Sequence, residues 1–186
     1  MALPELEAFT LVGGTALSLQ IGHRISVDLD LFGKSDLPHQ EIIFLLSDFS
    51  SPQIVSQTKN ILILNIAGIK VDFVNYSYPF LKSINISDRI RLSSLEDIAA
   101  MKLAAIAGRG RMRDFTDIYF LLKQYTLSEL IQFYNNKYPD GSEFMVAKSL
   151  SYFEDAEQDE PPNMIVDVDW ETIKGEITEE VNRMYR

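Results

Sequence analysis

The chain has 186 residues, of which 46% are apolar and 24% are charged, with no cysteine and two histidines. This is the composition of a globular protein, and it excludes a disordered or fibrous chain, a disulfide framework and a zinc site built on thiolates. The length predicts one domain. The sequence shows no basic leader and no apolar run of about 20 residues, so we expect a cytoplasmic protein without a membrane partner.

The net charge of −10 is unevenly distributed along the chain. Residues 1–100 carry a net charge of −4, residues 101–153 carry +2 and residues 154–186 carry −8. The total argues against a general nucleic-acid coat protein, because such a protein needs a positive face to release counterions from phosphates. The basic middle section still allows local contact with RNA or a nucleotide.

Alternating apolar residues and glycine turns in the first half predict a sheet of at least four strands. In chain order we expect a strand at 9–12, a helix at 15–21, a strand at 26–32, a helix at 40–49 and strands at 60–66 and 69–75. The last two strands are separated by Ala67-Gly68, which predicts a hairpin.

The second half predicts helices, each preceded by a residue suited to capping its first turn. They span 94–107, 113–124, 126–137, 140–153 and 170–185, with Ser94, Thr126, Asp140 and Asp169 as N-terminal caps. Residues 154–160 contain five acids and precede Pro161-Pro162, which indicates an exposed linker.

Three acidic residues on predicted strands suggest a magnesium site. Asp28 and Asp30 are two residues apart on a strand, so their carboxylates project from the same face and could share one or two hard cations. Asp72 lies on another alternating strand and could supply a third carboxylate. The alternative is a solvated face with surface acids.

A phosphate site is suggested by Gly13, Gly14 and Thr15, which stand where a strand turns into a helix. Backbone N–H groups at a helix start bind phosphate oxygens, and glycines allow a close approach. An ordinary turn or helix cap is the alternative for an isolated Gly-Gly-Thr.

Together, Leu11–Phe32 resembles the signature of nucleotidyltransferases with the DNA polymerase β-like minimal fold, and more narrowly the AbiEii/AbiGii nucleotidyltransferase toxin family. The matching positions are Gly13, Gly14, Thr15, Arg24, Ser26, Asp28, Asp30, Asp72, Lys102, Arg113, Asp114 and Asp117. The resemblance implies an α+β fold, with a mixed twisted sheet, packed helices and a helical C-terminal half. We expect a nucleotidyltransferase domain at 1–153, with its sheet core at about 1–92 and its helical part at about 93–153. An acidic linker and C-terminal helix follow at 154–186.

The resemblance also implies a reaction. Two Mg²⁺ ions held by Asp28, Asp30 and Asp72 would bind a nucleoside triphosphate (NTP), and an acceptor hydroxyl would attack its α-phosphate. Asp72 would complete the metal site or help to activate that hydroxyl. A tRNA or another RNA is the favoured acceptor, and an antitoxin is the expected partner. A small-molecule or protein acceptor, and a non-catalytic interaction module with this fold, are the alternatives.

Several further residues are open to two interpretations. Lys102, within an apolar helix, either reaches the solvent at the helix edge or contacts a bound anion and takes part in catalysis. Arg24 either pairs with an acid or binds the nucleotide, as Ser26 would. The remaining candidates are Arg109, Arg111 and Arg113, for RNA or phosphate contact, and Asp114, as a helix cap. We reject Asp167 and Asp169 as a metal pair, and we assign structural or surface roles to His23 and His39.

Overall fold

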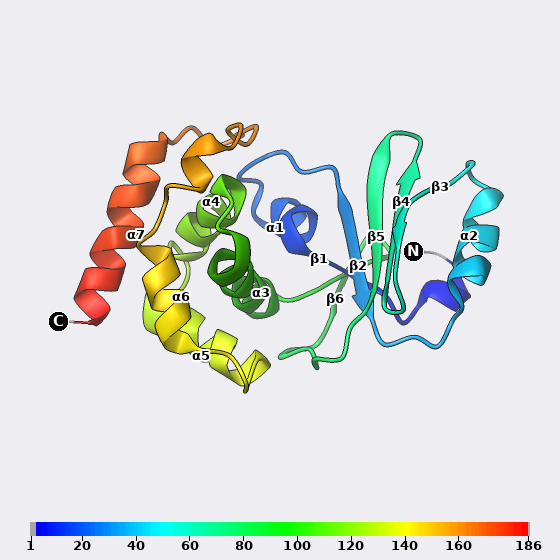
Figure 1. Cartoon of the computed structure of the whole chain (residues 1–186), viewed down its shortest axis with the longest axis horizontal. Coiled ribbons are helices and arrows are strands. Elements are labelled where there is room, and N and C mark those ends of the chain that lie inside the picture. Colours follow the sequence, from blue (N-terminus) through cyan, green and yellow to red (C-terminus); the bar gives the residue numbers. More distant parts are fainter. Residues whose placement is uncertain (1–2, 186) are drawn as a thin grey trace.

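In the computed structural model, which describes residues 3–185, seven strands form one mixed, twisted sheet (Figure 1). The strands are β1 (Thr10–Val12), β2 (Leu29–Gly33), β3 (Gln53–Gln57), β4 (Ile61–Ile66), β5 (Ile69–Asn75), β6 (Asn85–Ser87) and β7 (Ile90–Leu92). Their order across the sheet is β3-β4-β5-β2-β1-β7-β6. The β1–β7 and β2–β5 pairs are parallel and the other pairs are antiparallel. The predicted α+β fold with a mixed sheet is therefore confirmed.

Seven α-helices accompany the sheet within the described residues. They are α1 (Gly13–Ile21), α2 (His39–Ser47), α3 (Leu95–Arg109), α4 (Met112–Leu121), α5 (Leu127–Lys137), α6 (Glu143–Leu150) and α7 (Trp170–Met184). In Figure 1, α1 and α3 lie on one side of the sheet, α2 lies on the other side, and α4 to α7 stack beyond α3. The helical second half is thus present as expected. No helix within residues 3–185 has the length and apolar character needed to cross a bilayer.

The two faces of the central strands have different characters. Leu31 and Phe73 are buried on the side of α2, whereas Asp30 and Asp72 line a cleft beside α3. This division follows from the alternation of side chains along a strand. It places the acids of β2 and β5 on the face that the helices approach.

The predicted strand at 26–32 is shorter in the structure, because β2 begins at Leu29. Residues 26–28 instead form a loop that is tied to α1 by Thr15, whose hydroxyl hydrogen-bonds Ser26 (2.9 Å) and donates to the carbonyl of Asp28. Val27, which alternates with the acids in the predicted strand, is 64% exposed. The alternating pattern is real, but only its second half pairs with neighbouring strands.

Most predicted caps are present. Ser94 and Asp169 accept hydrogen bonds from the backbone of their helices, and Thr126 forms a complete capping box with Glu129. The cap at Asp140 is wrong: α6 begins at Glu143 and is capped by Ser142. A turn closed by the bond from Gly141 N to Tyr138 O delays the helix by three residues.

The C-terminal segment pairs with the loop between α1 and β2 before it forms the last helix. Ile25 N donates to Asn163 O (2.7 Å), and Ile165 N donates to His23 O (3.0 Å). Helix α7 then packs against α4, α5 and α6. The proposed boundary after residue 153 remains a prediction. Residues 1 and 2 of the predicted nucleotidyltransferase domain lie outside the described part of the chain.

Candidate active site

The centre of the site is a carboxylate pair on adjacent parallel strands. Asp30 on β2 and Asp72 on β5 are direct register partners, and both line a cleft of about 470 Å³ between the sheet and α3. Burial, and after it the charge of Asp72, raises the pKa of Asp30 above its ordinary value. The Oδ1 atom of Asp72 is buried without a hydrogen-bond partner among the described residues, while Lys70 pairs with its Oδ2. Such a pair is suited to neutralisation by a cation.

The two glycines leave room for side chains of the site. Gly13 has a φ of +70°, and a Cβ atom there would lie 2.4 Å from Oδ2 of Asp30. A Cβ on Gly14 would lie 2.2 Å from the guanidinium of Arg24. The missing Cβ atoms at Gly13 and Gly14 therefore leave the space that the side chains of Asp30 and Arg24 occupy. Gly13 also lines the cleft, where the start of α1 faces the carboxylates.

Asp28 stands apart from the other two acids. Its carboxylate lies 3.9 Å from the guanidinium of Arg113, and it lines a second cleft of about 670 Å³. Within residues 3–185, no three acidic or histidine side chains lie close enough together to hold a metal ion. The structure thus brings Asp30 and Asp72 together, whereas Asp28, two residues before Asp30, lines the other cleft. Thr15, expected to contact phosphate, is buried and holds the loop that carries Asp28.

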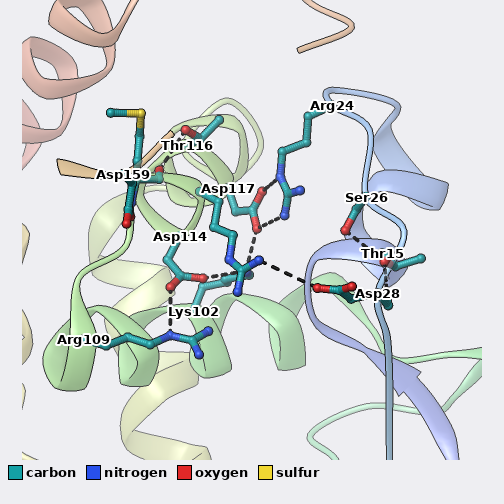
Figure 2. A network of polar contacts seen from close by, with 12 residues as sticks. Thr15, Arg24, Ser26, Asp28, Lys102, Arg109, Asp114, Thr116, Asp117 and Asp159 are labelled. Atoms are coloured by element: carbon teal, nitrogen blue, oxygen red, sulfur yellow. Dashed lines mark hydrogen bonds and ion pairs between the residues drawn. The ribbon is translucent and has the colours of Figure 1, made fainter. Parts of the chain in front are cut away.

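A buried ion network supports the helical wall of the cleft, and Asp117 is its hub (Figure 2). Its carboxylate binds His23 Nε2 at 2.7 Å, Arg24 Nε at 2.7 Å and Lys102 Nζ at 2.6 Å. Burial alone would raise the pKa of Asp117, but the positive charge of Lys102 and the bonds from His23 and Arg24 hold it well below its ordinary value. Asp117 is therefore ionised throughout the physiological range.

Lys102 connects this network to the cleft. Its Nζ also lies 2.7 Å from Asp114, and the side chain is 8% exposed. Burial opposes the charged form, yet the carboxylates of Asp117 and Asp114 outweigh it and raise the pKa of Lys102. Lys102 therefore does not extend to solvent, and the anions that it contacts are two side chains of the protein. Arg24 is likewise paired, with Asp117.

Three arginines between the last residue of α3 and the first turn of α4 each contact a carboxylate, yet all three remain about half exposed. Arg109 pairs with Asp114 (3.3 Å), Arg111 pairs with Asp159, and Arg113 faces Asp28. Their side chains are 51–56% exposed, and all three line the second cleft. They form a basic rim along the second cleft, and Arg109 also lines the first cleft with Asp30 and Asp72.

Other predictions for single residues had mixed outcomes. Asp114 is wrong as a helix cap, because its buried carboxylate binds Lys102 and Arg109 in place of backbone N–H groups. His23 has the expected structural role, through Asp117. Asp169 caps α7 and Asp167 is exposed, so neither joins the site.

Sequence reasoning missed three residues around the clefts. Phe32 and Tyr138 line the first cleft, and Asp159 binds both Arg111 and the backbone N–H of Met112. Phe32 could have been found, since it continues the alternation of Asp28 and Asp30 along one strand face. Tyr138 and Asp159 carry no local signal, because the fold brings them from distant segments.

Comparison with known proteins agrees with this geometry. Residues 2–183 match the model of the family described as nucleotidyl transferase AbiEii toxin, type IV toxin–antitoxin system. A protein of Aquifex aeolicus is 37% identical over 157 residues, covering 81% of this chain and 76% of the relative.

Two solved structures share the fold at low sequence identity. JHP933 from Helicobacter pylori is 19% identical with a TM-score of 0.57, and the match covers 96% of this chain and 84% of JHP933. The nucleotidyltransferase toxin MenT4 from Mycobacterium tuberculosis H37Rv is 15% identical with a TM-score of 0.57, covering 93% of this chain and 74% of MenT4. With the family match spanning almost the whole chain, this protein belongs to the AbiEii family of nucleotidyltransferase toxins.

Proposed function

We propose that this nucleotidyltransferase transfers a nucleoside monophosphate from an NTP to a hydroxyl of RNA, with tRNA as the favoured acceptor, in a reaction that requires Mg²⁺. The observation that carries the proposal is the register pair Asp30 and Asp72 inside the cleft, with one buried Asp72 oxygen lacking a partner. Two ionised carboxylates side by side in a partly buried site repel each other, and a cation bound between them relieves this repulsion.

The donor set fits a hard divalent cation, since the ligands available in the cleft are carboxylate oxygens. Asp30 and Asp72 would hold the metal, and Asp28 would join them if its carboxylate left Arg113. When bound, Mg²⁺ neutralises charge on the phosphates and on the leaving pyrophosphate.

The residues of the chain then have distinct tasks. The oxygen of the acceptor hydroxyl forms a bond to the α-phosphorus, while the bond between that phosphorus and the pyrophosphate oxygen breaks. We assign the hydroxyl proton to the carboxylate of Asp72, which lies beside Asp30 in the cleft. Gly13, at the positive end of α1, and the half-exposed Arg109 support the phosphates electrostatically.

An RNA acceptor is supported by the basic rim of Arg109, Arg111 and Arg113. These side chains are accessible along the second cleft, which Asp28 also lines, and arginine binds phosphate through a planar pair of donors. RNA contact through such side chains weakens with salt, so Arg111→Ala should reduce the salt slope of RNA binding. An unchanged slope would contradict the assignment of this rim to RNA.

The reaction is tested by incubating the protein with each α-³²P-labelled NTP, MgCl₂ and total RNA or protein. We expect labelled RNA with wild type and a loss of at least 100-fold in Asp30→Ala, because the carboxylate pair is broken. Asp167→Ala is the matched control: it removes an exposed acid of the second Asp-x-Asp pair and should retain full labelling.

The same preparation distinguishes the remaining possibilities. Label on protein, with none on RNA, would contradict the RNA acceptor and leave the transferase reaction intact. Absence of any label, together with a melting temperature unaffected by MgCl₂ and every NTP, would favour the non-catalytic module.

A further inference from the structure

The first cleft has a polar end and an aromatic end. Along α3 its wall runs from Gly108 and Arg109 to Met101, and on the sheet side it is lined by Asp30 and Phe32. Asp30 and Phe32 are alternate residues of β2, about 6.6 Å apart along the strand. Tyr138, which follows α5, also lines the cleft. An aromatic surface therefore begins one strand repeat beyond the catalytic carboxylate.

The two aromatic rings are held in place by neighbours outside the cleft. The hydroxyl groups of Tyr138 and Tyr76 lie 2.8 Å apart, and the ring of Tyr76 lies 5.1 Å from that of Phe32. Tyr78 packs edge-on against Tyr138 with ring centres 4.8 Å apart. Each ring is thus fixed before any ligand arrives, so that little side-chain freedom remains to be lost on binding.

This aromatic cluster has a charged anchor beneath it. Lys137 is fully buried, and its Nζ lies 5.2 Å from the ring centre of Tyr76. The same atom binds Asp97 (2.7 Å) and the carbonyl of Pro79 (3.0 Å). Asp97 in turn accepts hydrogen bonds from the backbone of Leu81. The network links α3, α5 and the chain after β5, and so fixes the position of Tyr138.

The polarity of the cleft sets the direction of a bound nucleotide. Phosphates belong near Gly13, Asp30 and Arg109, where the start of α1, the proposed metal and a guanidinium meet. In an NTP, one ribose separates the α-phosphate from the base, and the distance between Asp30 and Phe32 can accommodate it. The flat base then reaches the aromatic end.

We infer that Phe32 and Tyr138 form the stacking surface for the base of the incoming NTP. This inference rests on the proposed function, since it takes the phosphate end of the cleft as given. Stacking on aromatic rings is tolerant of base identity because every base has a π face. The surface therefore makes the protein bind nucleotides more tightly than polyphosphates that have no base.

The test compares two probes, each NTP and inorganic tripolyphosphate, by equilibrium binding in MgCl₂. Wild type should bind at least one NTP tenfold or more tightly than tripolyphosphate. Tyr138→Leu and Phe32→Leu should each weaken the binding of that NTP about tenfold, and each should change the affinity for tripolyphosphate by less than twofold. Tyr138→Phe keeps the ring and should retain NTP affinity.

Tyr152→Leu is the matched control, because the ring of Tyr152 is 49% exposed and does not line the cleft. It should leave the preference for NTP unchanged. A wild-type protein that binds both probes equally, or a Tyr138→Leu variant that weakens both equally, would overturn the stacking surface alone. NTP binding that is normal in Tyr138→Leu and Phe32→Leu, with a raised KM for RNA, would assign the rings to an acceptor base and overturn the inference. Binding of neither probe by wild type would contradict the proposed function itself.

Discussion

Several charged residues of this protein are important because they are buried. Asp117 is fully buried, yet it contacts three groups that are or can be cationic: His23, Arg24 and Lys102. Removing one member of such a network leaves charges buried without compensation, which costs far more than an exposed ion pair is worth. The sequence motif indicated that Asp117 matters, but its role as a hub depends on residues 15, 93 and 94 positions away in the chain.

Asp117→Asn should lower the free energy of unfolding by about 3–5 kcal/mol at pH 7, because Arg24 and Lys102 lose their compensating charge. The folded pKa of Asp117 is depressed, so the stabilisation is fully present above the unfolded value of about 3.9 and is lost as pH falls below it. The difference between variant and wild type should therefore shrink below about pH 4. Urea unfolding at several pH values measures both effects.

Glu176→Gln is the matched control, since Glu176 pairs with Lys123 at the surface with both side chains more than 40% exposed. It should change the unfolding free energy by less than about 1 kcal/mol at any pH. A comparable loss in both variants would show that burial of the network has no special weight.

At the level of elements, prediction succeeded where a local signal was strong. The strands β4 and β5, their turn at Ala67-Gly68 and the capped helices α3 and α5 have clear periodicity or capping residues. The strands β3, β6 and β7 were not predicted, because β3 is exposed on both faces and the other two have three residues each. The alternating pattern of the strands predicted that Asp30 and Asp72 lie close together. It did not predict that Asp28 lies apart from them, because this depends on β2 beginning at Leu29.

The turn between β1 and α1 offers a test that separates backbone strain from contact with the site. Gly13→Ala and Gly22→Ala both place a side chain at positive φ, +70° and +65°, and each should cost about 1–2 kcal/mol of stability. Only at Gly13 would the new Cβ collide with Asp30, whereas the space around Gly22 is open. RNA labelling should fall at least tenfold in Gly13→Ala and stay normal in Gly22→Ala.

Chemical denaturation of both variants shows whether each is folded under the assay conditions. Equal labelling by the two folded variants would mean that the close approach of Gly13 to Asp30 has no catalytic consequence.

At the scale of the whole molecule, the C-terminal segment is integrated with the rest of the chain. Ile173, Ile177 and Val181 of α7 are buried in the main apolar core, although the segment from residue 154 onward is strongly acidic. Composition suggested an appendage because it reports surface charge. It could not show that one stripe of a polar helix packs on α4, α5 and α6.

The predicted boundary after residue 153 can be tested directly. A chain of residues 1–153 would expose the apolar surfaces that α7 covers, so we expect it to lose cooperative unfolding and to aggregate on heating. Within the full chain, Ile177→Ala should cost about 2–5 kcal/mol, because it opens a cavity in the core. Ile165→Ala, at a side chain that is 60% exposed, should cost less than about 0.5 kcal/mol. If residues 1–153 unfold cooperatively with the same thermal midpoint as the full chain, the boundary is right and α7 contributes nothing to the stability of the catalytic part. A lower thermal midpoint, or loss of the cooperative transition, would make α7 a structural part of the enzyme.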